Sequence, residues 1–69
     1  MVVYVVSTKD KMSGNSKVSS VCYEDIQDAI DFCKKRSDYV RSKSAFVHEG
    51  AFTEYTITEA RCEAKKDNG

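Results

Sequence analysis

The stretch EDIQDAIDFCKKR, residues 24–36, decides the fold of this 69-residue chain. Its apolar residues recur at positions i, i+3, i+4 and i+7, a spacing that places them along one side of an α-helix: Ile26, Ala29, Ile30 and Cys33. Acidic residues precede this stripe and basic residues follow it, which suits the helix macrodipole at both ends. The pattern predicts a helix from about residue 24 to about residue 37, with Asp25 as its N-cap. Tyr39 and Val40 continue the seven-residue spacing, so one further helical turn is an open alternative.

Two β-like stretches precede this helix. Residues 2–6 form a continuous run rich in valine, which predicts a central strand with both edges paired. Residues 17–23 predict a returning strand, joined to the first by a turn near residues 13–16 that contains Gly14 and Asn15. Because the apolar residues of the second strand alternate poorly, we expect either a β-bulge or a partly exposed edge there.

After the helix, the sequence leaves the topology open. Residues 42–44 are a polar break, and residues 45–47 and 52–57 are rich in β-forming side chains. The segment 45–58 therefore fits either a hairpin or one long strand with a bulge at Gly50.

Together these elements predict a small α+β domain over residues 1–62. In this fold class a ββαβ or ββαββ chain forms two layers, with one helix packed on one face of a three- to four-stranded antiparallel sheet. Residues 63–69 carry no large apolar side chain and are expected to form a disordered C-terminal tail. One helix cannot cover every aromatic side chain of such a sheet, so we expect some of the following to be exposed: Tyr4, Tyr23, Phe46, Phe52 and Tyr55.

The overall composition excludes several classes of protein. The chain has 11 basic and 11 acidic residues, and its net charge of zero excludes a histone-like binder and an acidic mimic of DNA. An odd number of cysteines without local pairs does not describe a disulfide framework. No apolar run approaches the length of a membrane span, and the first residues lack the features of a secretory signal. We therefore expect a cytoplasmic protein without a membrane partner.

No set of side chains in the sequence spells out a catalytic or metal site. His48 is the single histidine and lacks the nucleophile that a catalytic triad needs. The residue types of a zinc site are present, but the gaps between them are wider than in structural zinc sites: Cys22, Cys33, His48 and Cys62. The carboxylates at the start of the helix are accounted for by the helix dipole. The sequence therefore predicts a protein that is not an enzyme, with no catalytic residue, no cofactor and no metal.

Three stretches resemble small ββαβ proteins of bacteriophage and bacterial genomes: YVV at residues 4–6, KVSSVCYEDIQDAIDF at 17–32 and FTEYTIT at 52–58. The resemblance covers about residues 3–58 and consists of structural positions, so it implies a fold and no site residues. Some phage proteins of this size bind and inhibit a host enzyme or a defence complex. The resemblance therefore implies a protein-binding role, as a phage-type inhibitor or accessory protein that acts on a host protein.

The function predicted from the sequence is a small protein-binding module whose partner is a host or cognate protein, with a homodimer as a further candidate. Its predicted interface combines aromatic residues of the uncovered sheet face with the basic segment 34–43: Tyr4, Tyr23, Phe52, Tyr55, Lys34, Lys35, Arg36, Tyr39, Arg41 and Lys43. In the alternative, the bases around Tyr39 bind a nucleic acid or a small ligand, because bases beside an aromatic ring can hold a phosphate backbone and stack a base.

Overall fold

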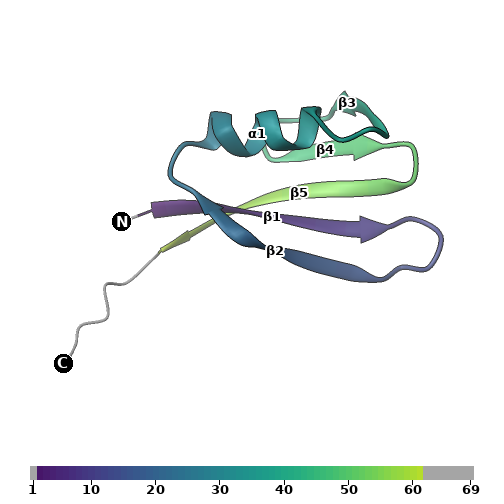
Figure 1. Cartoon of the computed structure of the whole chain (residues 1–69), viewed down its shortest axis with the longest axis horizontal. Helices are drawn as coiled ribbons and strands as arrows, with labels where there is room; N and C mark the ends of the chain where they lie inside the picture. The colour runs from purple at the N-terminus through teal and green to yellow at the C-terminus, as the bar shows by residue number, and fades with distance from the viewer. Residues whose placement is uncertain (1, 62–69) are drawn as a thin grey trace.

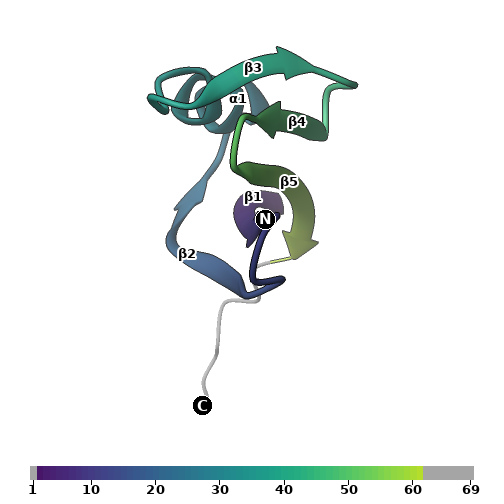
Figure 2. The same ribbon diagram turned by 90° about the vertical axis from the view of Figure 1, so that its right-hand side faces the viewer.

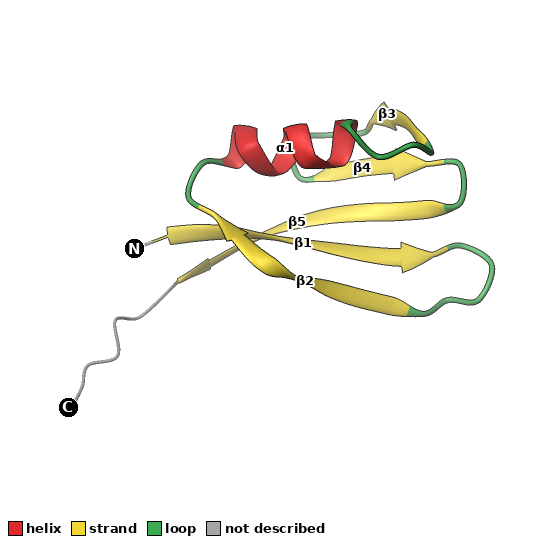
Figure 3. Cartoon of the chain, viewed as in Figure 1, coloured by secondary structure: helices red, strands yellow, loops and turns green. Residues whose placement is uncertain are grey.

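The computed structural model describes residues 2–61, which form five strands and one helix (Figure 1). Their order along the chain is β1 (Val2–Asp10), β2 (Ser16–Tyr23), α1 (Ile26–Lys34), β3 (Tyr39–Ser42), β4 (Val47–Gly50) and β5 (Thr53–Arg61). The strands form one antiparallel sheet in the spatial order β2-β1-β5-β4-β3. The α+β fold class predicted from the sequence is wrong, because the chain is mostly β. More than half of the described residues lie in strands, and the one helix is short (Figure 3).

The strands are longer than the apolar runs that predicted them. β1 and β5 each hold 9 residues and pair along their whole length, from Val2 opposite Arg61 to Asp10 opposite Thr53. Polar residues occupy the outer part of β1, and there the paired backbone donors and acceptors extend the ladder without a hydrophobic signal. A prediction from apolar periodicity therefore ends such strands too early.

A second difference lies at residues 35–42, where the sequence allows another helical turn. The helix ends before this segment; the amide of Arg36 donates to the carbonyl of Cys33, and the amide of Tyr39 donates to the carbonyl of Arg36. These turns reverse the chain, and Tyr39 then pairs with Gly50 as the first residue of β3. This segment therefore supplies β3, a strand that the predicted fold does not contain.

The first hairpin and the start of the helix agree with the sequence predictions. β1 lies inside the sheet, between β2 and β5, and the turn after β1 contains Gly14 at φ 79°, a left-handed conformation that suits glycine. Asp25 is the N-cap of α1, and its carboxylate accepts a hydrogen bond of 2.9 Å from the amide of Gln27. The segment 45–58 is a hairpin of β4 and β5, which resolves that alternative. Residue 62, the last of the predicted domain, and residues 63–69, the predicted tail, lie outside the described residues.

The core lies between α1 and the centre of the sheet. Its side chains are at most 2% exposed: Val6, Ala29, Cys33, Tyr55 and Ile57. The cross-strand pairs Val6–Ile57 and Tyr55–His48 place β1, β5 and β4 around this core. The sheet is strongly twisted, and α1 lies to one side of it (Figure 2). Because side chains alternate along a strand, the intervening residues point to the opposite, uncovered face.

Candidate functional site

Most aromatic residues of the predicted interface lie on the helix side of the sheet. Tyr55 is 2% exposed, and its hydroxyl donates a hydrogen bond to the carboxylate of Asp38. A ring that is buried in the core cannot contact a partner, so the structure removes Tyr55 from the candidate interface. Three more aromatic residues are partly buried against the same core: Tyr4, Tyr23 and Tyr39.

Two phenylalanines are exposed, as expected for part of the aromatic set. Phe46 is 43% exposed and precedes β4, whereas Phe52 is 65% exposed and lies between β4 and β5. Both residues lie in loops, so the expectation of an aromatic face on the uncovered side of the sheet is wrong. Strand alternation places aliphatic, small and charged residues on that face instead: Val3, Val5, Ser7, Lys9, Val47, Glu49, Glu54, Thr56, Thr58 and Ala60. Of these, Val3 is buried, at 8% exposed.

His48 lies on β4 and is 1% exposed. Its Nε2 is 3.2 Å from the carbonyl oxygen of Ala45, and its Nδ1 is 3.2 Å from the hydroxyl of Tyr39. A carbonyl oxygen only accepts hydrogen bonds, so Nε2 carries a hydrogen, and in the neutral ring Nδ1 then accepts from the Tyr39 hydroxyl. Both ring nitrogens are therefore used within the fold, and His48 links β4 to β3.

The residues that match zinc ligands by type lie apart. Cys33 is in the core, where burial raises the pKa of its thiol and the positive charge of Arg36 lowers it to a smaller extent. Cys22 is exposed on β2, and Cys62 lies outside the described residues. Across residues 2–61, no group of three or more His, Cys, Asp or Glu side chains is placed to hold a metal ion.

The basic segment 34–43 is divided between two elements. Three of its bases lie at or just after the end of α1, and two lie on or just after β3: Lys34, Lys35, Arg36, Arg41 and Lys43. The guanidinium of Arg36 lies 5.5 Å from the centre of the Phe32 ring, a cation–π contact within the fold. Arg41 pairs across the sheet with Glu49, on the uncovered face. The bases of the segment are therefore divided between the end of α1 and β3, and two of them, Arg36 and Arg41, already have partners within the fold.

Arg41 and Lys43 belong to a cluster of three cations around one carboxylate. Oε2 of Glu49 lies 2.6 Å from Nζ of Lys11. Oε1 of Glu49 lies 3.0 Å from Nε of Arg41 and 4.0 Å from Nζ of Lys43. Hydrogen bonds from Lys11 and Arg41, together with their charges, lower the pKa of Glu49 to about 2. Lys11 is absent from the predicted interface because 38 positions separate it from Glu49, and no local pattern connects them.

Phe52 is exposed although both of its backbone groups are hydrogen-bonded. The amide of Lys11 donates to the carbonyl of Phe52 at 3.0 Å, and the amide of Phe52 donates to the carboxylate of Asp38 at 3.2 Å. The first bond joins the β1–β2 turn to the β4–β5 turn at one end of the molecule (Figure 1). Met12, in the β1–β2 turn, is 87% exposed. We call this surface the tip surface and define it by five residues: Lys11, Met12, Arg41, Lys43 and Phe52.

Asp38 holds the turn that carries Phe52. Its carboxylate accepts from the Phe52 amide and the Tyr55 hydroxyl, and its carbonyl accepts from the Ala51 amide at 2.6 Å. The hydrogen bond from Tyr55 is the main reason why the pKa of Asp38 lies below its usual value. Burial, and then this same hydrogen bond, raises the pKa of Tyr55. A Cβ atom on Gly50 would lie 2.5 Å from Oδ2 of Asp38, so a side chain at position 50 would have to displace this carboxylate from its hydrogen bonds.

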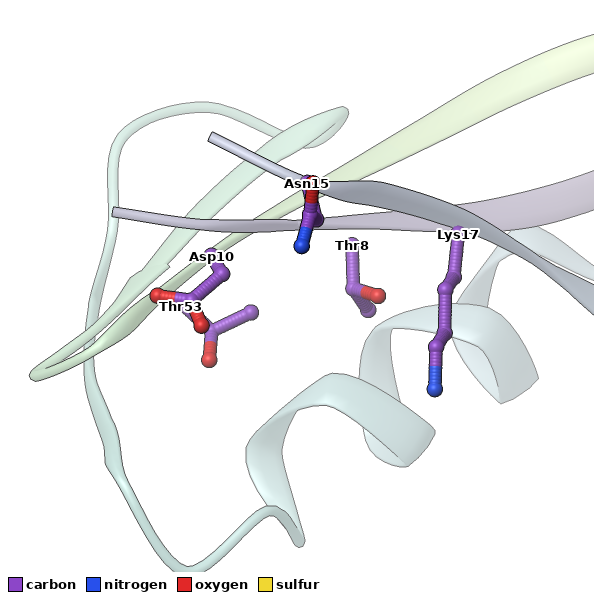
Figure 4. Close-up of a pocket in the computed structure, with 5 residues that line it drawn as sticks. All are labelled: Thr8, Asp10, Asn15, Lys17 and Thr53. Atoms are coloured by element: carbon purple, nitrogen blue, oxygen red, sulfur yellow. The ribbon is translucent and has the colours of Figure 1, made fainter. Parts of the chain in front are cut away.

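A hollow of about 320 Å³ lies beside the β1–β2 hairpin, on the helix side of the sheet (Figure 4). Five polar residues line it: Thr8, Asp10, Asn15, Lys17 and Thr53. Oδ1 of Asp10 already accepts a hydrogen bond of 2.9 Å from the amide of Met12. The remaining lining includes one base and no apolar wall, so the hollow does not define a class of ligand.

Comparison with protein-family models, with curated proteins and with solved structures found no match to this chain. In the part of the chain that the structure describes, no helix is long and apolar enough to cross a membrane. The geometry and charge of the tip surface are therefore the features from which a function can be inferred.

Proposed function

We propose that this chain is a small protein-binding module that docks through its tip surface and performs no catalysis. The observation that carries the proposal is Phe52, a 65% exposed aromatic side chain on a turn whose backbone is held on both sides. Aromatic anchors contribute a large share of the binding free energy of protein interfaces. Because the turn is already ordered, less conformational entropy is lost when Phe52 enters a partner's pocket.

The surroundings of Phe52 support this proposal. Met12 comes from the neighbouring turn, and its unbranched thioether adapts to an uneven partner surface. The carbonyl of Phe52 is bonded to the amide of Lys11, the residue before Met12, and Lys11 in turn reaches Glu49, so the cation cluster adjoins the turn that carries Phe52. An apolar centre beside a charged rim is the usual composition of a protein interface.

Docking by addition of a strand at a sheet edge has less support. β2 and β3 are the edge strands, and each contains a register shift. In β2 the shift lies between the residues opposite Val5 and Ser7, and in β3 it lies between Tyr39 and Arg41. Such bulges bend an edge strand and interrupt its row of free donors and acceptors.

The resemblance to small phage proteins supports a more specific role, in which the chain inhibits or assists a host enzyme or a defence complex. This role depends on the resemblance alone, whereas the tip surface supports the binding of a protein in general. Binding of a nucleic acid through residues 34–43 has less support, since these bases are divided between α1 and β3.

Photo-crosslinking at position 52 tests the proposal. In the test chain, the photoreactive residue p-benzoylphenylalanine replaces Phe52. In the matched control chain it replaces Phe46, which is also exposed and lies at the other end of β4. Each chain is irradiated in a nuclease-treated lysate of the cells that produce it, and crosslinked proteins are identified by mass spectrometry. We expect one protein that is crosslinked from position 52 and not from position 46.

Competition then decides whether this crosslink reports binding by Phe52. Excess unlabelled chain should displace the crosslinked protein, whereas the Phe52→Ala variant should bind about 2 kcal/mol more weakly, roughly 30-fold, and fail to displace it. Equal crosslinking from both positions, or equal competition by Phe52→Ala, would rule out docking through the tip surface. If the crosslinked species is a second copy of the chain, the tip surface serves self-association instead.

A further inference from the structure

We propose that the partner of the tip surface is an acidic protein segment, whose carboxylates bind Lys11, Arg41 and Lys43 beside a pocket that receives Phe52. This inference rests on the proposed function, because it names the chemistry of the partner at the same surface. It is carried by the arrangement of charges around Glu49.

The cation cluster presents positive charge to the outside. The side chain of Glu49 is 18% exposed, whereas those of its cationic neighbours are 34%, 68% and 47% exposed, in the order Lys11, Arg41 and Lys43. The carboxylate therefore lies beneath the cations, and one negative charge does not neutralise three positive charges. Glu54, across the sheet from Glu49, is matched by its own cross-strand neighbour Lys9, so the excess of positive charge remains. A partner meets the cations first, and their potential attracts an acidic group.

Glu49 also orders the cations before a partner arrives. Nε of Arg41 donates to Oε1 of Glu49, and Nζ of Lys11 donates to Oε2. Within residues 2–61 the guanidinium of Arg41 makes no other hydrogen bond, so its terminal N–H groups are free for a partner. A guanidinium binds a carboxylate with two parallel hydrogen bonds, and a side chain that is already ordered loses less entropy in doing so.

The charges of the whole chain favour the same orientation. The net charge is zero, but four acidic residues gather before and along the start of α1: Glu24, Asp25, Asp28 and Asp31. The start of α1 lies toward one end of the molecule, and the β1–β2 and β4–β5 turns lie toward the opposite end (Figure 1). An acidic partner is therefore attracted at the tip surface and repelled at the other end, which steers it to the correct side.

An acidic protein segment fits this surface better than a nucleic acid does. Glu54 lies directly opposite Glu49 on the same face of the sheet, and Lys9 lies opposite Glu54, so beyond the cation cluster this face carries balanced charge and no continuous cationic track for a phosphate backbone. The tip surface also offers one aromatic ring, whereas proteins that bind single strands stack successive bases on several rings. A protein segment needs only a few carboxylates next to apolar side chains.

Selection from a displayed library of random peptides tests the inference even though the partner is not identified. The immobilised chain selects peptides, and counter-selection on the Phe52→Ala variant retains those that depend on Phe52. We expect the retained peptides to be rich in Asp and Glu next to apolar residues. Their affinity should fall about 10-fold for the Arg41→Gln/Lys43→Gln variant and change less than about twofold for the control Lys34→Gln/Lys35→Gln. This difference should shrink in about 1 M salt, where the Debye length is only about 3 Å.

The outcomes separate this inference from the proposed function. Peptides that depend on Phe52 but are neutral or basic, or that bind the Arg41→Gln/Lys43→Gln variant equally well, overturn the acidic partner and leave docking through Phe52 intact. If no peptide depends on Phe52, the proposed function itself fails. A single-stranded oligo(dT) that binds more tightly than every selected peptide assigns the surface to nucleic acid. Circular dichroism checks that each variant is folded; if the double variant is not, Lys43→Gln alone takes its place, since Lys43 is the most distant cation from Glu49.

Discussion

Replacing Gly50 by alanine tests the contact that positions Phe52. A Cβ atom at this position would lie 2.5 Å from Oδ2, 2.7 Å from Cγ and 2.9 Å from Oδ1 of Asp38, so the whole carboxylate is in its way. The carboxylate has little freedom to withdraw, because it accepts hydrogen bonds from the Phe52 amide and the Tyr55 hydroxyl. The substitution therefore strains the turn or breaks these bonds.

The expected cost follows from these two alternatives. A hydrogen bond to a charged group contributes about 1.5–3 kcal/mol, and overpacking of a tight site costs about 1–3 kcal/mol. The loss of chain entropy in the unfolded state offsets about 0.4–1 kcal/mol when glycine becomes alanine. We expect Gly50→Ala to lower the free energy of unfolding by about 1–3 kcal/mol, a substantial part of the roughly 5–15 kcal/mol that stabilises a typical domain.

Urea denaturation followed by circular dichroism measures this cost, and a double-mutant cycle assigns it to Asp38. In an Asp38→Ala background, Gly50→Ala should cost less than about 0.5 kcal/mol, because the obstructing carboxylate is gone. Gly14→Ala is the matched control, since no atom lies within 4 Å of its added Cβ and only the φ of 79° opposes it. The control should cost about 1 kcal/mol. The reasoning is refuted if Gly50→Ala changes stability by less than about 0.5 kcal/mol, or costs as much in the Asp38→Ala background.

Two further predictions concern His48 and the cation cluster. His48→Ala should lower the free energy of unfolding by about 2–4 kcal/mol, because it leaves a cavity and unpaired groups on Tyr39 and Ala45. Tyr39→Phe removes only one of these hydrogen bonds and should lower the free energy of unfolding by about 1 kcal/mol. Urea denaturation measures both variants, and equal losses of stability would contradict this account of His48. The folded-state pKa of Glu49 is lowered from 4.5 to about 2, so its stabilising contribution is present above pH 4.5 and is lost as the pH falls through 2. The lowered pKa of Asp38 acts in the same direction. Glu49→Gln should therefore flatten, without abolishing, the loss of thermal stability in acid, and an unchanged acid profile would count against the cluster.

The helix shows what a local pattern predicts well. Asp25 and the Gln27 amide that it caps are two positions apart, and the buried residues Ala29 and Cys33 are one helical turn apart. Each of these relations is decided by neighbouring positions, so the sequence alone identifies them. The predicted helix, from about residue 24 to about residue 37, is longer than α1, because charged residues on either side of the apolar stripe are counted as helical.

β3 and the tip surface show where a local pattern fails. Tyr39 has the spacing of a helical residue, but its pairing with Gly50 and its hydrogen bond to His48 exist only after the chain has reversed. The chemistry that surrounds Phe52 is likewise assembled from distant segments. Its carbonyl is bonded to Lys11 and its amide to Asp38, and no periodicity in the sequence connects these positions.

By itself, the sequence determined the helix, the central position of β1 and the first hairpin, because these depend on apolar runs and on turn or cap residues a few positions apart. Only the tertiary structure decided the number of strands, the burial of Tyr55 and the gathering of Lys11, Arg41 and Lys43 around Glu49. These features depend on the register between distant strands. Register is set by the sum of many cross-strand contacts, and a shift of one residue exchanges the two faces of a strand, so short-range patterns do not determine it.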